Sequence, residues 1–199
     1  MKTIIFDLGN VLLSFHPNEY LLQYFDQQTL EDLLIMIFCS DEWLELDLGN
    51  LTVEELIEIF SKRNPHYKEE ITFTLNNWYK MFKPIKENID ILKKLKELGY
   101  SLYYLSNFQK ESFEKLYNKY DFFKLFDGGV VSAYEHTIKP NYKLYEILLE
   151  RYCLNPKECL FIDDTLMNIR SAYELGIEGI ELCYGVILKD ELLKKGIEL

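Results

Sequence analysis

The chain has 199 residues, 48% of them hydrophobic, and a formal net charge of −11 at pH 7. This length is enough for one buried core with a small second module. The acidic balance argues against nucleic acid or an anionic membrane as a partner, because both require a basic surface. The first apolar run is too short for a signal peptide and no run approaches a membrane span, so we expect a cytoplasmic protein.

Five short apolar runs predict buried β-strands, at residues 4–6, 101–105, 129–132, 159–162 and 179–183. Between the later runs, apolar residues recur at helical spacing over residues 88–98, 113–120, 141–152 and 167–175. Gly99 and Gly176 directly follow two of these segments, as glycine often does where a helix ends. Strands that alternate with helices predict an α/β fold, with a parallel sheet covered on both faces.

Residues 17–81 interrupt this alternation. They contain no predicted strand and offer amphipathic helical segments at residues 20–25, 30–38, 53–60 and 71–82. Thr52 precedes Glu54 and Glu55, which is typical of a capped helix start. An insert of this length is too long for a loop. We interpret it as a helical lid over the strand ends; the alternative is a helical flank on the sheet edge.

Polar residues gather where the predicted strands end. In a parallel sheet these ends meet at one edge, where ligands bind. Three carboxylates in one cleft would repel each other unless a cation neutralised them, and magnesium suits oxygen ligands of this kind. The residues at this edge are Asp7, Ser106, Asn107, Lys139, Asp163 and Asp164.

The residues at these strand ends resemble the four motifs of the haloacid dehalogenase (HAD) superfamily. Phe-Asp-Leu-Gly-Asn-Val at residues 6–11 is similar to the first motif, and Ser106-Asn107 to the second. Lys139-Pro140 is similar to the third, and Asp163-Asp164 with Asn168 to the fourth. The motifs occur in the right order along essentially the whole chain. Within the superfamily, the chain most resembles a sugar-phosphate phosphatase group that includes α-glucose-1-phosphate phosphatase and the phosphatase domain of soluble epoxide hydrolase.

The resemblance implies a fold, a domain division and a cofactor. The fold is a Rossmann-like sheet of five parallel strands in the order 5-4-1-2-3, with a helical cap inserted after strand 1. The core domain comprises residues 1–15 and 83–199, and the cap domain residues 16–82. The cofactor is Mg²⁺, bound by Asp7, the backbone carbonyl of Gly9 and Asp164, with Asp163 behind them or bound through water.

The resemblance also implies residue roles in phosphoester hydrolysis. Asp7 is the nucleophile, which forms an aspartyl-phosphate that water then hydrolyses. Lys139 offsets the carboxylates and holds the phosphoryl oxygens, and Ser106 donates to them as charge develops. Backbone amides nearby assist, and Asn168 orients its loop. The substrate-binding residues are Ser106, Asn107, Lys139, Gly9 and Asn10.

The chain departs from the superfamily pattern at Gly9. Most phosphatases of the superfamily have a second aspartate here, which protonates the leaving group and later activates water. Its loss matters, because general acid–base catalysis typically contributes about 10²–10⁴-fold. Three accounts remain open: a substrate with a good leaving group, another residue or a water in its place, or a slow or non-hydrolytic relative. His16 is one candidate replacement, although a surface or hinge role is the simpler interpretation.

Several residues also have plain structural interpretations. Ser106 is a candidate cap for the following helix, and Asp163 is a candidate N-cap residue. Trp43 and Trp78 are candidates for a sugar pocket, with packing inside the lid as the default.

The leading function is a magnesium-dependent phosphatase for a small phosphorylated metabolite, a sugar phosphate above all, with the protein a monomer or homodimer. One alternative is a 2-haloacid dehalogenase, which needs no metal and leaves Asp163 and Asp164 unexplained. Another is a binding or regulatory protein with weak catalysis, which the glycine at position 9 favours. A phosphomutase fits less well, because it depends on the missing acid.

Overall fold

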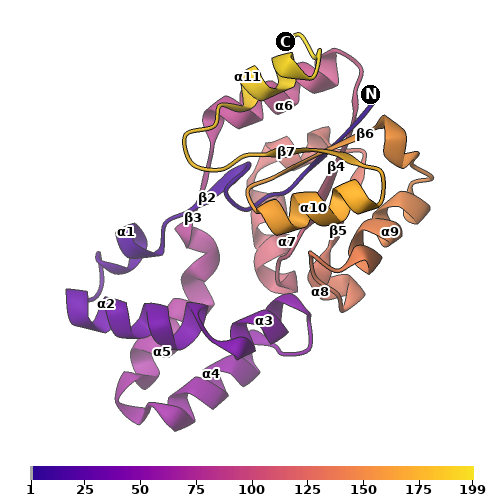
Figure 1. The fold of residues 1–199 in the computed structure, drawn as a ribbon. Helices are drawn as coiled ribbons and strands as arrows, with labels where there is room; N and C mark the ends of the chain where they lie inside the picture. The colour runs from indigo at the N-terminus through magenta and orange to yellow at the C-terminus, as the bar shows by residue number, and fades with distance from the viewer. Residues whose placement is uncertain (1) are drawn as a thin grey trace.

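The computed structural model describes residues 2–199 and is built around one parallel sheet (Figure 1). Its strands lie in the order β5-β4-β1-β6-β7, with β1 pairing with β4 and β6. Numbered 1 to 5 along the chain, this order is 3-2-1-4-5, which is 5-4-1-2-3 from the opposite edge. The predicted α/β fold is therefore confirmed. The strands are β1 (Thr3–Phe6), β4 (Ser101–Ser106), β5 (Gly128–Val131), β6 (Cys159–Asp163) and β7 (Glu178–Glu181).

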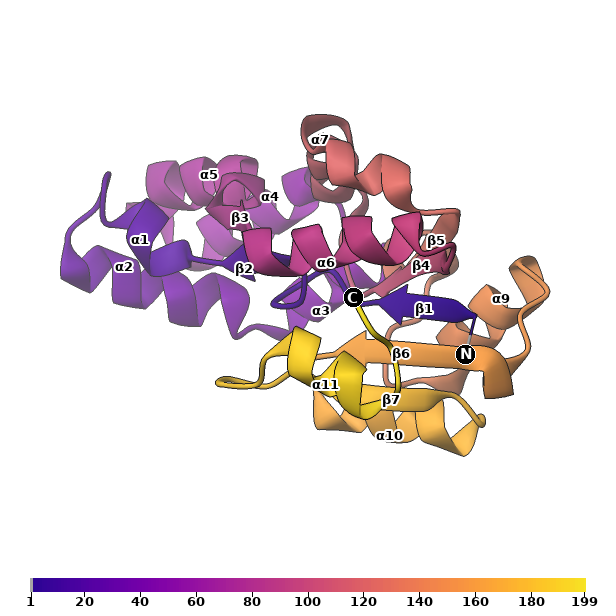
Figure 2. The same ribbon diagram turned by 90° about the horizontal axis from the view of Figure 1, so that it is seen from above.

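Helices cover both faces of the sheet (Figure 2). Ile4 and Phe6 point into the apolar cluster beneath one set of helices, whereas Ile5 between them points into the opposite cluster. Burial on both faces explains why β1 reads as an unbroken apolar run. One set is α6 (Lys86–Glu97), α7 (Lys110–Lys119) and α11 (Leu188–Lys194), and the other is α9 (Tyr142–Arg151) and α10 (Leu166–Glu174). Shorter elements are η4 (Asp121–Leu125), α8 (Ser132–Glu135) and η5 (Pro156–Glu158).

Residues 17–81, which we call the cap segment, are helical and extend away from the sheet (Figure 1). They form an apolar cluster of their own, in which Leu33, Leu56, Phe60 and Ile71 are almost completely buried. This cluster accounts for the amphipathic pattern of the segment. The elements are α1 (Pro17–Leu21), α2 (Gln27–Leu33), the π-helix η1 (Leu34–Phe38), α3 (Asp41–Asp47), α4 (Val53–Arg63), η2 (Pro65–Tyr67), α5 (Lys68–Asn77) and η3 (Trp78–Met81).

A two-stranded antiparallel ribbon joins the cap segment to the core. It consists of β2 (Leu13–Phe15) and β3 (Phe82–Pro84), paired from Leu13 with Pro84 to Phe15 with Phe82. The chain therefore leaves and re-enters the core at one place. That residues 16–82 form a separate domain remains a prediction.

The structure differs from the predicted elements mainly in and around the cap segment. Helix α3 was not predicted; it is only seven residues long, too short for a clear periodic pattern, and begins at the Ser40 cap. The first cap helix covers Pro17–Leu21 rather than residues 20–25, because Pro17 occupies its first turn. Phe82, expected to be helical, lies in β3. Ser132, expected in a strand, begins α8.

The cap segment touches the core at the end of α3. The Ser132 hydroxyl donates to the backbone oxygen of Asp47 (2.6 Å). Gly49 approaches the core backbone so closely that a Cβ there would lie 2.3 Å from the Ala133 oxygen. Gly49 also has a φ of +71°, a conformation that other residues rarely adopt.

Gly49→Ala is therefore expected to separate α3 from α8 and to destabilise the protein by about 2 kcal/mol or more, measured by urea denaturation. Gly99→Ala is the matched control. Gly99 has a φ of +87°, but a methyl group added there would have no described atom within 4 Å. Gly99→Ala should therefore show only the backbone strain that it has in common with Gly49→Ala, about 1–2 kcal/mol. Equal losses in the two variants would show that the Ala133 contact does not matter.

Candidate active site

Asp7 directly follows β1 at the centre of the sheet, and its carboxylate is buried against a lysine. Lys139 Nζ lies 2.8 Å from Asp7 Oδ1 and 2.6 Å from Asp163 Oδ2. The Lys139 and Asp163 side chains are 1% and 0% exposed, so this ion-pair triad is closed to solvent on the core side. The structure thus brings together three of the predicted site residues, from the ends of β1 and β6 and the loop before α9.

Burial and charge act against each other on these groups. Burial raises the pKa of Asp7 to about 6; the Lys139 ammonium offsets part of this effect, the Asp163 carboxylate adds to it and the Ser106 hydroxyl lowers it slightly. For Lys139, burial alone would lower the pKa, but Asp7 and Asp163 outweigh it and raise the pKa. The lysine therefore stays charged, and it faces two carboxylates with one positive charge.

Amide side chains hold this triad in place. Asn168 Nδ2 donates to both Asp163 oxygens (2.9 and 3.1 Å). Asn107 exchanges two hydrogen bonds with the Lys139 backbone: its Nδ2 donates to the carbonyl (3.0 Å), and its Oδ1 accepts from the amide (2.8 Å). Asn107, predicted to bind substrate, therefore also fixes the lysine loop. The Thr165 amide completes the coordination of Asp163 (2.8 Å).

Three carboxylates could share a cation. Asp7, Asp163 and Asp164 each offer an oxygen, and these atoms lie within 4.8 Å of one another. An all-oxygen donor set of this size suits magnesium. Asp163 already pairs with Lys139 and accepts hydrogen bonds from Asn168. Within residues 2–199, Asp164 accepts hydrogen bonds only from Asn10 Nδ2 (3.0 Å) and its neighbour Thr165. Asp7 and Asp164 are thus the freer donors.

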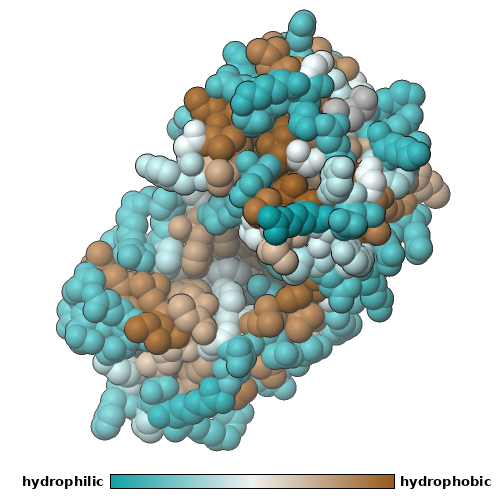
Figure 3. All heavy atoms as spheres, viewed as in Figure 1, coloured by the Kyte–Doolittle hydropathy of each residue, from teal (hydrophilic) through white to brown (hydrophobic). Residues whose placement is uncertain are grey.

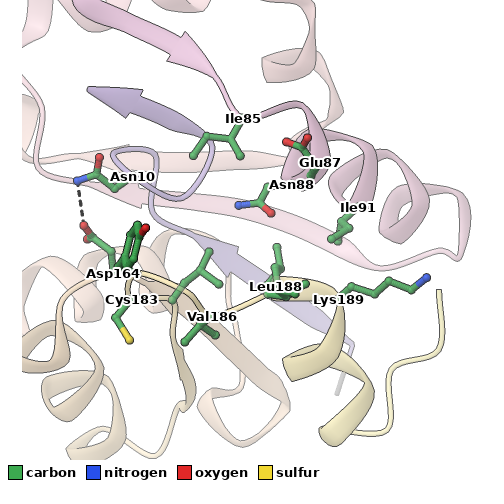
Figure 4. A pocket seen from close by; sticks show the side chains of 13 residues that line it. Asn10, Ile85, Glu87, Asn88, Ile91, Asp164, Cys183, Val186, Leu188 and Lys189 are labelled. Carbon is green, nitrogen blue, oxygen red and sulfur yellow. Dashed lines mark hydrogen bonds between the residues drawn. The ribbon is translucent and has the colours of Figure 1, made fainter. Parts of the chain in front are cut away.

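Asp164 also borders a groove on the outer side of this carboxylate cluster (Figure 4). The groove has a volume of about 890 Å³ and lies between the start of α6 and residues 182–189. Figure 4 shows Asn10 and Asp164 at one end, joined by their hydrogen bond, with Ile85, Val186 and Leu188 along the walls. The Asp164 carboxylate therefore remains accessible from solvent.

A second cavity, of about 250 Å³, opens directly onto Asp7, Ser106 and Lys139. Figure 3 shows the hollow between the core and the cap segment, with apolar side chains around it. Trp43 and Trp78 both line the cavity and contact each other edge to face, with ring centroids 4.7 Å apart. They therefore do not serve only to pack the interior of the cap segment. The aromatic rings of its wall belong to Phe15, Trp43, Trp78, Phe82 and Phe108.

Asp47, the last residue of α3, also lines this cavity and was not among the predicted site residues. Burial, and to a lesser degree the negative charge of Asp7, raises the pKa of Asp47 to about 7. Within residues 2–199 its carboxylate has no ion-pair partner within 4.0 Å. No sequence signal marks it, because only the docking of α3 on the core brings it near Asp7.

The structure also distinguishes between the alternative roles predicted for Ser106, Asp163 and His16. Ser106 is 1% exposed and lines the cavity; it does not cap α7, whose N-cap is Gln109. Asp163 accepts from the amide of Thr165 but lies before the N-cap position of α10, which Thr165 occupies. His16 is not among the cavity-lining residues and instead pairs with Ser14 (2.7 Å) on the ribbon side. This placement favours the structural interpretation of His16.

Comparisons with known proteins agree with this geometry. The haloacid dehalogenase-like hydrolase family matches residues 4–181, so the chain belongs to this family. A sesquiterpene phosphatase of Aspergillus oryzae is 27% identical over 91% of this chain and 89% of its own. A phosphorylated carbohydrates phosphatase of Thermotoga maritima is 27% identical over 94% and 86%.

The fold is shared with a variant HAD family enzyme from Bacteroides thetaiotaomicron, solved in complex with magnesium and inorganic phosphate. The TM-score is 0.76 and the identity 22%, over 96% of this chain and 98% of that one. Together with the phosphatase relatives, the family membership identifies the chain as a HAD-type phosphatase hydrolase. Among the described residues, no helix combines the length and the apolar character needed to cross a bilayer.

Proposed function

We propose that the protein is a magnesium-dependent phosphatase that hydrolyses a small phosphorylated metabolite through an aspartyl-phosphate on Asp7. The observation that carries this proposal is the buried Asp7–Lys139–Asp163 triad opening onto a cavity beside a third carboxylate, Asp164. A phosphoryl group placed in this cavity meets a carboxylate nucleophile, an ammonium and the Ser106 hydroxyl.

Each of these groups has a distinct task. Asp7 attacks phosphorus, and the bond to the leaving oxygen breaks. Lys139 and Ser106 hold the equatorial oxygens while their charge is redistributed. Water then hydrolyses the acyl phosphate, releasing inorganic phosphate and restoring the carboxylate. Asn107 acts through Lys139, whose backbone it holds on both sides.

Asp7 and Asp164, with the Gly9 carbonyl, are the proposed magnesium ligands, and Asp163 stands behind them. A bound magnesium ion would neutralise the carboxylates and bind phosphoryl oxygen. The need for magnesium separates the proposal from a 2-haloacid dehalogenase. A phosphate monoester brings a dianion into an acidic site, whereas dehalogenation does not and needs no metal. Magnesium binding would also explain why Asp163 and Asp164 lie beside Asp7.

The cavity wall supports a leaving group with an apolar face. Trp43, Trp78 and Phe108 present ring surfaces, and Trp78 Nε1 is a buried donor without a partner among the described residues. Sugar rings offer such a face together with hydroxyls for the indole. Short isoprenoid or aryl groups offer it without hydroxyls, and the aromatic rings of the wall favour them as the second substrate class. The two phosphatase relatives act, by their names, on one class each.

The test is a panel of sugar, prenyl and aryl phosphates, assayed for phosphate release over a series of magnesium concentrations and after chelation. We expect turnover that chelation abolishes and magnesium restores, with no nucleic-acid or membrane component required. Turnover that is insensitive to chelation, or chloride release from 2-haloacids, would exclude the proposal. Metal binding without turnover across the panel would instead indicate a regulatory protein. Sedimentation in the same buffer distinguishes monomer from homodimer.

A further inference from the structure

The position two residues after the nucleophile has room for a side chain but has none. Gly9 lacks a positive φ, and apart from adjacent residues a Cβ there would meet no described atom closer than Asp7 Oδ2, at 4.0 Å. Backbone strain and crowding therefore do not require this glycine. No side chain at position 9 can move a proton, so a leaving group that needs one must receive it from another residue or from water.

Asp47 approaches the reaction cavity from the cap side, opposite the core. Among the residues that line this cavity, the titratable ones are Asp7, Lys139 and Asp47. Lys139 is committed to two carboxylates and Asp7 is the nucleophile. Of these three, only Asp47 is neither the nucleophile nor part of an ion pair among the described residues. It lies on the side of the cavity where the leaving group must be if Asp7 attacks from the core.

The position of Asp47 is fixed by contacts between the cap segment and the core. The Ser132 hydroxyl holds the Asp47 backbone oxygen at 2.6 Å and also accepts from the Phe108 amide at 2.9 Å. Phe108 itself lines the cavity, so one hydroxyl links the backbone of Asp47 to the cavity wall. The close approach of Gly49 to Ala133 fixes the chain two residues further on.

Building on the proposed phosphatase function, we propose that Asp47 is the general acid and base of the reaction, supplied by the cap in place of the missing aspartate at position 9. In the first step the Asp7 carboxylate forms a bond to phosphorus, the bond to the leaving oxygen breaks, and the Asp47 carboxyl gives that oxygen its proton. In the second step the Asp47 carboxylate takes a proton from water, whose oxygen attacks phosphorus as the bond to Asp7 breaks.

The environment of Asp47 suits both steps. A group that donates and then accepts a proton works best with a pKa near the operating pH, and burial brings the pKa of Asp47 to about 7. Because the group belongs to the cap segment, proton transfer becomes possible only when α3 is docked on α8. Catalysis is thereby coupled to closure over the substrate.

Two phosphates of similar size test the assignment. The nitrophenolate of 4-nitrophenyl phosphate leaves without a proton, whereas the alkoxide of 2-phenylethyl phosphate needs one. For Asp47→Asn we expect kcat/KM to fall about 10²–10⁴-fold for the alkyl ester and less than about 5-fold for the aryl ester. Asp41→Asn, on the exposed side of the same helix, is the control and should leave both values unchanged.

Moving the acid to position 9 is a second test of the role of Asp47. Gly9→Asp in the Asp47→Asn background should recover alkyl-ester activity by at least about 10-fold, because it restores a carboxyl beside Asp7. Equal losses for both esters in Asp47→Asn would mean that the residue only docks the cap, and would overturn the inference. So would a double variant that regains nothing. A wild-type protein inactive on both esters with magnesium would defeat the phosphatase proposal itself.

Discussion

Asp7→Asn is expected to lower kcat about 10³-fold or more on every phosphate that the wild type hydrolyses. The amide keeps the shape of the side chain but cannot attack phosphorus, so no aspartyl-phosphate forms. The measurement is phosphate release at saturating magnesium. Acid-quenched labelling with ³²P-substrate adds a direct readout, because only the wild type should retain label that hydroxylamine removes. Asp121→Asn, at an exposed ion pair, should behave as wild type.

The same substitution should not weaken the fold. Burial raises the pKa of Asp7 from 3.8 to about 6, so folding disfavours its ionised form. The stability associated with a raised carboxyl pKa is present below pH 3.8 and is lost as pH rises through about 6. Asparagine removes this loss. At pH 8 in chelator, Asp7→Asn should therefore melt at the same temperature as wild type or higher. An inactive variant that melts lower would leave misfolding as the cause of its inactivity.

Lys139→Ala should be strongly destabilising, costing about 3–5 kcal/mol at pH 8 without magnesium. It leaves Asp7 and Asp163 buried with no counter-charge, and unpaired buried carboxylates carry a large desolvation cost. Urea denaturation measures the loss. Lys96→Ala is the matched control: Lys96 pairs with Asp127 at the same 2.6 Å distance, but both side chains are at least a third exposed. It should cost about 0–1 kcal/mol.

The Lys139→Ala deficit should shrink as pH falls. Lys139 lowers the pKa of Asp7, so its removal lets burial raise that pKa above about 6. At pH 5.5 the Asp7 carboxyl of the variant is then protonated, which removes part of the uncompensated buried charge; wild type gains less, because its Asp7 pKa is lower. Denaturation at pH 8 and pH 5.5 gives the comparison. A deficit independent of pH would show that the lysine contributes packing rather than charge.

The core half of the site could be predicted because topology determines it. Once β1, β4 and β6 are read as parallel neighbours, Asp7, Ser106 and Asp163 must end at one edge of the sheet. Local periodicity is sufficient for that inference. The distances between these side chains depend on how the loops fold. Asn107 holds the Lys139 backbone and Asn168 holds the Asp163 carboxylate, and the sequence predicts neither contact.

The cap half of the site could not be predicted in the same way. Asp47 and Trp43 lie on α3, a helix too short to show a period, and neither sits in a motif. Their approach to Asp7 depends on Ser132 and Gly49, which are contacts between segments about 85 residues apart. Such tertiary docking leaves no trace in neighbouring residues, so packing inside the lid was the default interpretation of Trp43 and Trp78, and a pocket was only a candidate role.

Because the chain enters and leaves the cap segment through the paired strands β2 and β3, the cap segment can be replaced as a unit. Phe15 and Phe82 are direct partners across the ribbon, so a foreign insert whose ends are equally close can be spliced between them without rerouting the core. Substrate preference can then be transplanted while the nucleophile and lysine stay in place. Under our assignment of Asp47, such a chimera works only if the new insert brings its own proton donor or if an aspartate is introduced at position 9.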